Sequence, residues 1–146
     1  MVRLLGPGDE ALLARAALIH LGRDWPPDRC ARALADPAFV AVAAVDEGEA
    51  WGFAYGYALD RLHQTDLLLY SIDVLEARRR EGIGRAMVER LRAVCAERGY
   101  GEMWVVTNAS NRAAMRLYAS AGGVREFDDV EMFVFPPPGE PRGGGS

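Results

Sequence analysis

A glycine-containing stretch at residues 78–88, RRREGIGRAMV, has the residue types of a phosphate-binding turn. It follows a run typical of a strand and leads into a run with the apolar spacing of a helix. The first turn of a helix leaves backbone N–H groups unpaired, and the helix dipole adds partial positive charge there. A phosphate is the natural occupant, and Gly82 and Gly84 let it approach the backbone without a β-carbon in the way.

Other interpretations of this stretch make different demands on the sequence. A dinucleotide fingerprint needs G-x-G-x-x-G, but Met87 stands where the third glycine belongs. A P-loop needs a lysine followed by serine or threonine, and neither follows the glycines here. A solvated helix cap without a ligand stays open for this stretch alone. The stretch therefore predicts either a pyrophosphate cradle of another kind or an empty cap.

The rest of the chain supplies the elements that position this stretch. Apolar runs of strand length lie at residues 2–5, 39–45, 51–59, 67–74, 102–107 and 130–135. Helical patterns lie at residues 10–21, 26–35, 83–98 and 111–121. Antiparallel strands come first and strand–helix–strand units follow. This order predicts an α+β (α/β) fold, with a mixed, mostly antiparallel sheet of six to seven strands and helices on both faces.

Length and composition favour a single domain with its own core. The chain has 146 residues, of which 50% are hydrophobic and 26% charged, as in ordinary globular proteins. We expect the domain to span residues 1–136. The Pro- and Gly-rich tail at residues 137–146 is expected to be disordered.

The charge balance and the cysteines exclude several classes of protein. A formal net charge of −4 and a pI of about 5.2 argue against a nucleic-acid binder and suit a cationic small-molecule partner. Cys30 and Cys95 lie far apart and predict reduced, buried thiols rather than a metal site. No run has the length of a membrane helix, and the start lacks the apolar core of a signal peptide. We therefore expect a cytoplasmic protein with no membrane partner.

Two separated motifs resemble those of the GCN5-related N-acetyltransferases (GNAT). The first is Arg-x-x-Gly-x-Gly at residues 79–84, preceded by Ile-Asp-Val at residues 72–74. The second is Asn-x-x-Ala-x-x-Leu-Tyr-x-x-x-Gly, which is matched by Asn111, Ala114, Leu117, Tyr118 and Gly122. Within that superfamily, RAALIHLGRDW, LADPAFVAVAAVDE and GGVRE resemble the gentamicin-type aminoglycoside 3-N-acetyltransferases. The resemblance implies the GNAT fold, with acetyl-CoA as co-substrate and no metal.

The resemblance also implies roles for individual residues. The implied cofactor-binding residues are Ile72, Val74, Arg79, Arg80, Glu81, Gly82, Ile83, Gly84, Arg85, Asn111 and Tyr118. Tyr118 would protonate the leaving thiolate, since a phenol and a thiol have similar proton affinities. A backbone N–H such as that of Val74 would stabilise the oxyanion. Taken alone, a tyrosine at this helical position could equally belong to the core.

The base that takes the proton of the amine is less clearly marked. Ser71 stands where related enzymes carry a carboxylate, and it is a poor base. Asp73 lies on the same face of the strand, so it is the predicted catalytic base, with a water chain as the alternative. The acceptor pocket is predicted to include Ser71, Asp128, Asp129 and Glu131, with Asp60 and Asp66 as further candidates.

The favoured function is transfer of an acetyl group from acetyl-CoA to a primary amine of a small cationic acceptor. The predicted acceptor is an aminoglycoside, modified at its 3-N position and so inactivated as an antibiotic. The first alternative keeps the chemistry but changes the acceptor to a protein N-terminus, a lysine, a polyamine or an amino-acid metabolite. The remote alternative is a nucleic-acid-binding module without catalysis, which the net charge disfavours. A homodimer is a further expectation.

Overall fold

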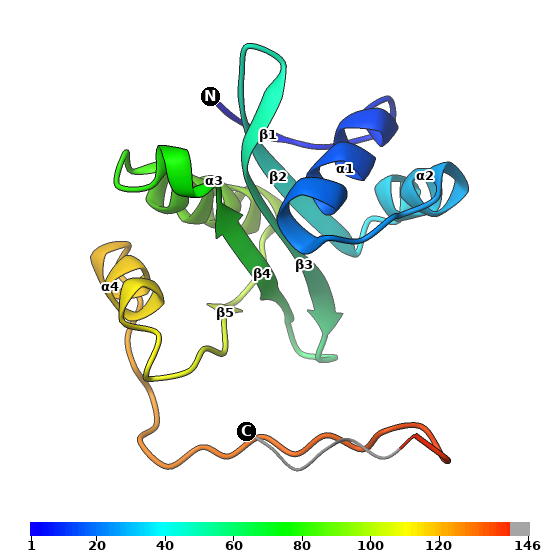
Figure 1. Cartoon of the computed structure of the whole chain (residues 1–146). Coiled ribbons are helices and arrows are strands. Elements are labelled where there is room, and N and C mark those ends of the chain that lie inside the picture. Colours follow the sequence, from blue (N-terminus) through cyan, green and yellow to red (C-terminus); the bar gives the residue numbers. More distant parts are fainter. Residues whose placement is uncertain (141–146) are drawn as a thin grey trace.

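The computed structural model describes residues 1–140 and contains a five-stranded mixed sheet with helices on both faces (Figure 1). The elements in chain order are β1 (Val2–Leu4), α1 (Glu10–Ala16), the π-helical turn η1 (Ala17–Leu21), α2 (Pro27–Ala35), β2 (Phe39–Asp46), β3 (Glu49–Asp60), β4 (Thr65–Val74), the 3-10 turn η2 (Glu76–Arg78), α3 (Ile83–Arg98), β5 (Met103–Trp104) and α4 (Arg112–Ser120). The strands lie in the order β1-β2-β3-β4-β5, and only β4 and β5 run parallel. The predicted fold class is confirmed.

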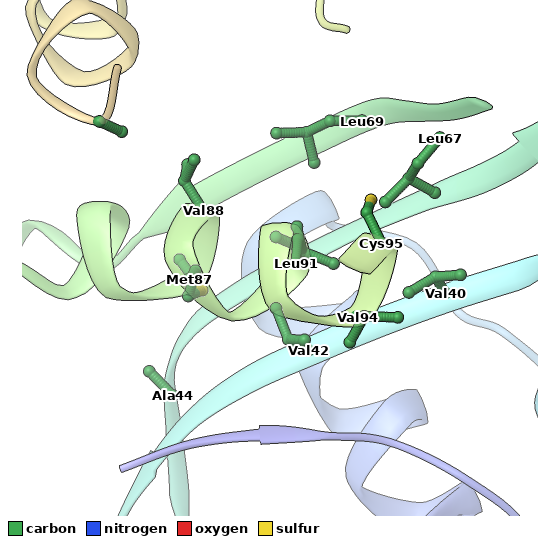
Figure 2. Packing of buried hydrophobic residues seen from close by; sticks show 12 residues of the cluster. Val40, Val42, Ala44, Leu67, Leu69, Met87, Val88, Leu91, Val94 and Cys95 are labelled. Atoms are coloured by element: carbon green, nitrogen blue, oxygen red, sulfur yellow. The ribbon is translucent and has the colours of Figure 1, made fainter. Parts of the chain in front are cut away.

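Alternate residues of the central strands fill two apolar clusters, one on each face of the sheet. In β2, Val40 and Val42 face α3, whereas Ala41 faces α1 and α2. Figure 2 shows the first cluster, in which Leu91 and Val94 of α3 lie beside β2. These two α3 side chains have no exposed surface, which agrees with the helical spacing in residues 83–98.

A bulge interrupts the pairing of β3 with β4 and changes the face toward which β4 side chains point. The register passes from Tyr55 opposite Ser71 to Gly56 opposite Leu69, so Tyr70 is an extra residue without a partner. Tyr70 and Ser71 consequently both line the α1/α2 side, although they are neighbours in the chain.

Glycine at position 56 makes this bulge sterically feasible. A β-carbon there would lie 2.1 Å from the carbonyl oxygen of Leu68. Because of the extra residue, Leu69 and Ile72 both face the α3 cluster, although they are three positions apart. Asp73 points to the opposite face, where it meets a side chain from η1.

The sheet is shorter at its C-terminal edge than the sequence predicts. The strand expected at residues 102–107 is confined to β5, and residues 130–135 form no strand. In Figure 1 the segment after α4 runs away from the sheet, so its backbone has no strand neighbour. The expected count of six to seven strands was therefore wrong for the described residues, which form five.

Large apolar side chains of this C-terminal segment are exposed. They include Val130, Met132, Phe133, Val134 and Phe135. Most of the tail expected to be disordered, residues 141–146, lies outside the described residues. Among residues 1–140, no helix has the length and apolar character needed to cross a bilayer.

Asp66 is a buried carboxylate that joins the start of β4 to the segment before β5. It accepts hydrogen bonds from the Glu102 backbone N–H at 2.9 Å, from Arg61 at 2.7 Å and from Gln64 at 2.8 Å. These donors, led by the Glu102 N–H, lower the pKa of the Asp66 carboxyl. The candidate role of Asp66 in an acceptor pocket was wrong, because its side chain is fully buried. Asp60 instead accepts a backbone hydrogen bond within the β3–β4 turn.

Asp66 should make the fold sensitive to acid. Its folded pKa lies below the ordinary value of 3.8, so its stabilisation is complete above about pH 4 and is lost as the pH falls toward the folded value. Asp66→Asn should be less stable at neutral pH and should lose less stability than the wild type between about pH 5 and pH 2. Urea unfolding across this range measures both effects. Asp24→Asn, at an exposed aspartate, is the control. If the free energy of unfolding fell equally with pH in the wild type and in Asp66→Asn, the stabilising role of Asp66 would be contradicted.

Candidate active site

The loop between β4 and α3 carries the glycine-containing stretch. In this loop Arg80 and Gly82 adopt left-handed backbone conformations, with φ of 68° and 81°. α3 then begins at Ile83, and no side chain among residues 1–140 caps its first turn. The N–H groups of that turn therefore have no helix partner and lie beside an exposed loop, which is the arrangement that binds an anion.

The two glycines of this loop have different surroundings. Gly82 has open space around it, but its φ of 81° disfavours a residue with a β-carbon. At Gly84, an added β-carbon would lie 3.2 Å from the Cδ2 atom of Leu117 in α4. The open space at Gly82 suits an anion, whereas Gly84 makes room for α4. This contact brings the second sequence motif against the first.

The first arginine of the stretch is tied to the protein. The Arg78 Nε donates to Glu81 at 2.8 Å, and its Nη1 donates to Asp46 at 3.3 Å. Its guanidinium also lies 4.8 Å from the centre of the Trp51 ring. The hydrogen bond to Glu81 is the main reason that the pKa of Arg78 is raised. Arg78 thus braces the loop against the end of β2, and the Nε of Arg79 donates to the Val74 carbonyl oxygen at 3.0 Å.

The C-terminal half of β4 has a free edge. β5 pairs only with Leu67 and Leu68, so residues 69–74 have no strand on that side within the described part of the chain. The N–H and C=O groups of a free strand edge can pair with an extended ligand. Ile72 and Val74, two of the predicted cofactor contacts, lie on this stretch directly before the loop.

Asn111 and Tyr118 lie at the start and near the end of α4. Asn111 caps the helix, since its Oδ1 accepts from the Ala114 N–H at 3.1 Å, and only its amide NH₂ is left for a ligand. Tyr118 is half-buried against the α3-side cluster, and this burial raises the pKa of its phenol. A phenol that keeps its proton at neutral pH suits the donor of a proton to a leaving thiolate.

His20 is a candidate site residue that the sequence prediction did not include. Its side chain is fully buried, with Nδ1 2.6 Å from Oδ2 of Asp73 and Nε2 2.9 Å from the Ala50 carbonyl oxygen. Arg79 lies on the other side of Asp73, with Nη2 3.8 Å from Oδ1. The available signal was a polar ring in an otherwise apolar helical stripe, and π-helical turns such as η1 recur at functional sites.

An aromatic cleft lies on the α1/α2 side of the sheet, beside the end of β4. Its lining residues are Leu21, Arg23, Trp25, Tyr55, Tyr70 and Ser71. The Tyr55 ring centre lies 5.6 Å from that of Trp25 and 5.7 Å from that of Tyr70. Burial, followed by the neighbouring tyrosines, raises the pKa of Tyr55 to about 12, so its ring stays neutral. Aromatic faces attract organic cations, and no carboxylate is among these lining residues.

The predicted acceptor-binding residues are divided between two places. Ser71 and Asp73 share one face of β4, because they lie opposite Tyr55 and Phe53 on β3. Asp128, Asp129 and Glu131 are exposed on the segment that leaves the sheet after α4 (Figure 1). The structure does not bring these three acids to Ser71, because their segment has no strand beside it. In residues 1–140, no group of His, Cys, Asp and Glu side chains could hold a metal ion.

Comparison with known proteins relates this geometry to one family. Residues 11–122 match the Acetyltransferase (GNAT) family. A ribosomal-protein-alanine N-acetyltransferase of Escherichia coli is 35% identical over 66 residues, which cover 45% of this chain and 45% of that protein. The chain therefore spans less than half the length of the curated relatives that it matches.

Solved structures share the fold over nearly the whole chain. An aminoglycoside acetyltransferase from an uncultured soil metagenomic sample has a TM-score of 0.77 and 26% identity, covering 92% of this chain and 98% of that one. A second such enzyme, solved with sisomicin, has a TM-score of 0.82 over 94% of this chain and 96% of its own, at 16% identity. The second likeness shows the fold alone.

The loop geometry predicts different effects for its glycines and its first arginine. Gly82→Val should raise the KM for acetyl-CoA by about tenfold or more, because a β-branched residue is strained at φ 81° and would displace the free N–H groups. Arg78→Ala should leave this KM within about twofold, because its brace lies outside the helix turn, but should lower the melting temperature. Thiol release and thermal unfolding measure both. Equal KM effects would contradict this ranking.

Proposed function

Because the chain belongs to the acetyltransferase (GNAT) family, we propose that the loop before α3 binds acetyl-CoA and that the aromatic cleft presents a primary amine to it. In this proposal the chain acts as an N-acetyltransferase that takes the acetyl group from acetyl-CoA, the donor that enzymes of this family use. The observation that carries the proposal is the uncapped first turn of α3 directly beside the free edge of β4. One feature suits a pyrophosphate and the other an extended pantetheine arm.

The proposed cofactor site uses backbone more than side chains. The amides from Arg80 to Arg85 hold the pyrophosphate, with the Arg79 guanidinium beside them. The backbone of Ile72 and Val74 pairs with the amides of the arm, and the Asn111 NH₂ donates to it. Bound acetyl-CoA supplies a thioester carbonyl, which an amine can attack at the end of β4.

The proposed chemistry needs a neutral amine, a stabilised oxyanion and a protonated leaving group. The amine nitrogen forms a bond to the thioester carbon, and a backbone N–H such as that of Val74 stabilises the oxyanion. The attacking nitrogen would release its extra proton to water, and the C–S bond would then break to give the amide. Tyr118 would give its proton to the thiolate and regain one from solvent. Burial of Tyr118 supports this role, because the raised pKa keeps its proton available at neutral pH.

The first proposed acceptor is an aminoglycoside, acetylated at its 3-N amine as by gentamicin-type enzymes, so that the antibiotic is inactivated. Support comes from the aminoglycoside acetyltransferase that is 26% identical over 92% of this chain. The net charge of −4 also favours a cationic ligand. We propose the cytoplasm as the place of action.

A second proposed acceptor is the α-amine of a protein N-terminus. The alanine N-acetyltransferase of Escherichia coli supports it, with 35% identity over 66 residues. The cleft supports it too, since Arg23 and three aromatic rings suit a single amine on an uncharged body better than a polycation.

A substrate panel should separate these acceptors. The full chain is incubated with acetyl-CoA and either gentamicin, kanamycin, an alanine-first peptide, spermidine or N-acetyl-lysine amide, and thiol release is followed. We expect turnover of at least one amine, with mass spectrometry locating the acetyl group. If only the peptide were acetylated, the proposal that an aminoglycoside is the acceptor would be contradicted. Absence of acetyl-CoA binding in calorimetry would contradict the cofactor site.

A homodimer is the proposed assembly. Trp104 is exposed on the edge strand β5, while Val130, Met132 and Val134 are exposed on a segment that pairs with no strand within residues 1–140. An open sheet edge and an apolar strand-forming segment complement each other between two copies.

Light scattering after size exclusion tests this assembly. The wild type should elute with the mass of a dimer, and Met132→Lys should shift the mass toward a monomer. Leu62→Lys, at an exposed apolar residue of the β3–β4 turn, is the matched control and should remain a dimer. A wild-type monomer at every concentration would contradict the proposal.

A further inference from the structure

Both ring nitrogens of His20 face hydrogen-bond acceptors, whereas a neutral imidazole carries only one N–H. The Ala50 carbonyl oxygen can only accept, so the Nε2 that lies 2.9 Å from it carries a hydrogen. A neutral imidazole has a single N–H, so Nδ1 would then face a carboxylate oxygen at 2.6 Å as a second acceptor. Two acceptors repel at that distance. A proton must therefore lie between Nδ1 and Oδ2.

The surroundings decide which partner is charged. The Asp73 side chain is 36% exposed, and the Arg79 guanidinium lies 3.8 Å from its other oxygen. Both favour a carboxylate over a carboxylic acid. The His20 ring has no exposed surface, and its Phe53 neighbour, with ring centres 6.2 Å apart, is apolar. A carboxylate at Asp73 leaves the shared proton on Nδ1 of His20, where this counter-charge offsets the burial of the ring.

This pairing limits what Asp73 can do as a base. If Asp73 took a proton from an incoming ammonium, the buried imidazolium would lose its counter-charge, which is costly in an apolar environment. The other carboxylate oxygen of Asp73, Oδ1, stays available to a ligand. The nearest Arg79 nitrogen is 3.8 Å away, beyond hydrogen-bond distance, so Oδ1 can still accept a hydrogen bond.

We propose that His20 is a positioning residue that holds Asp73 as a carboxylate and aims its free oxygen at the acceptor amine. The inference rests on the proposed function and sharpens it. Asp73 anchors the ammonium by a charge-assisted hydrogen bond, and the proton released before attack goes to water rather than to Asp73. The π-helical turn η1 and the end of β4 near Asp73 together fix the position of the acceptor nitrogen. A single anchoring carboxylate also suits an acceptor with one recognised amine.

Two substitutions of His20 separate its two hydrogen bonds. Asparagine can place an amide N–H near the position of Nδ1 and keep the donor to Asp73, while it loses the bond to Ala50. Glutamine can reach the Ala50 oxygen but leaves Asp73 without its donor. His20→Gln should raise the KM for the acceptor roughly 10- to 100-fold, as expected for a lost hydrogen bond to a charged group. His20→Asn should raise it clearly less, and both should leave the KM for acetyl-CoA within about twofold.

Kinetics with the acceptor from the substrate panel, together with thermal unfolding, measure these effects. His63→Gln is the matched control, because His63 is exposed in the β3–β4 turn. Equal losses in both His20 variants, in step with their melting temperatures, would show that His20 only supports the fold. Unchanged acceptor KM in His20→Gln would also overturn the proposal.

A spectroscopic test does not depend on turnover. In the ¹⁵N-histidine spectrum of the wild type at neutral pH, both ring nitrogens of His20 should carry protons, whereas Asp73→Asn should leave a single N–H. One protonated nitrogen in the wild type would overturn the ion pair. If no acceptor is turned over, the proposed function fails, but this spectrum still decides whether the pair exists.

Discussion

The bulge in β4 is the constraint on which both halves of the site depend. With Tyr70 inserted opposite the Tyr55–Gly56 step, β4 keeps leucines and Ile72 on the α3 side along most of its length. The same extra residue gives the α1/α2 side Tyr70, Ser71 and then Asp73. A regular strand would send Ile72 and Leu69 to opposite faces and break either the core or the cleft.

The position of β5 completes this arrangement. Because β5 meets β4 only at its first residues, the far end of β4 is left with an open edge just where the chain turns toward α3. Core, edge and cleft therefore meet within a few residues of Val74. Arg79 links them, since its Nε donates to the Val74 carbonyl at 3.0 Å while its tip approaches Asp73. A change at the proposed cofactor site can thus act electrostatically on the proposed acceptor site.

Sequence periodicity predicted the parts of the fold whose side chains are sorted by burial. The apolar stripe of α3 and the strand β2 were predicted correctly, because the hydrophobic effect buries these residues whatever their neighbours are. The segment 130–135 did not, since its strand pattern needs a neighbour that no local pattern can provide. The left-handed backbone at Gly82 agrees with the glycine at that position, because positive φ restricts residue choice.

The long-range part of the site was harder to predict. His20 and Asp73 are 53 residues apart, and only folding brings the ring and the carboxylate within hydrogen-bond distance. Asp66 was open to misassignment for the same reason, since an acidic residue in a polar loop gives no sign that its donors surround it. Polar pairing depends on tertiary contact, whereas apolar burial leaves a local signature.

The contact between Gly84 and Leu117 has a consequence for how this chain can vary. It sets the position of Tyr118 relative to the start of α3 by side-chain packing. Residues 106–110, between β5 and the Asn111 cap, can therefore change in length or composition while Tyr118, the proposed proton donor, stays in place. Residues 84 and 117 cannot change independently, because volume gained at one must be given up at the other. The two motifs pack as one steric unit, although Gly84 and Leu117 are more than thirty positions apart in the sequence.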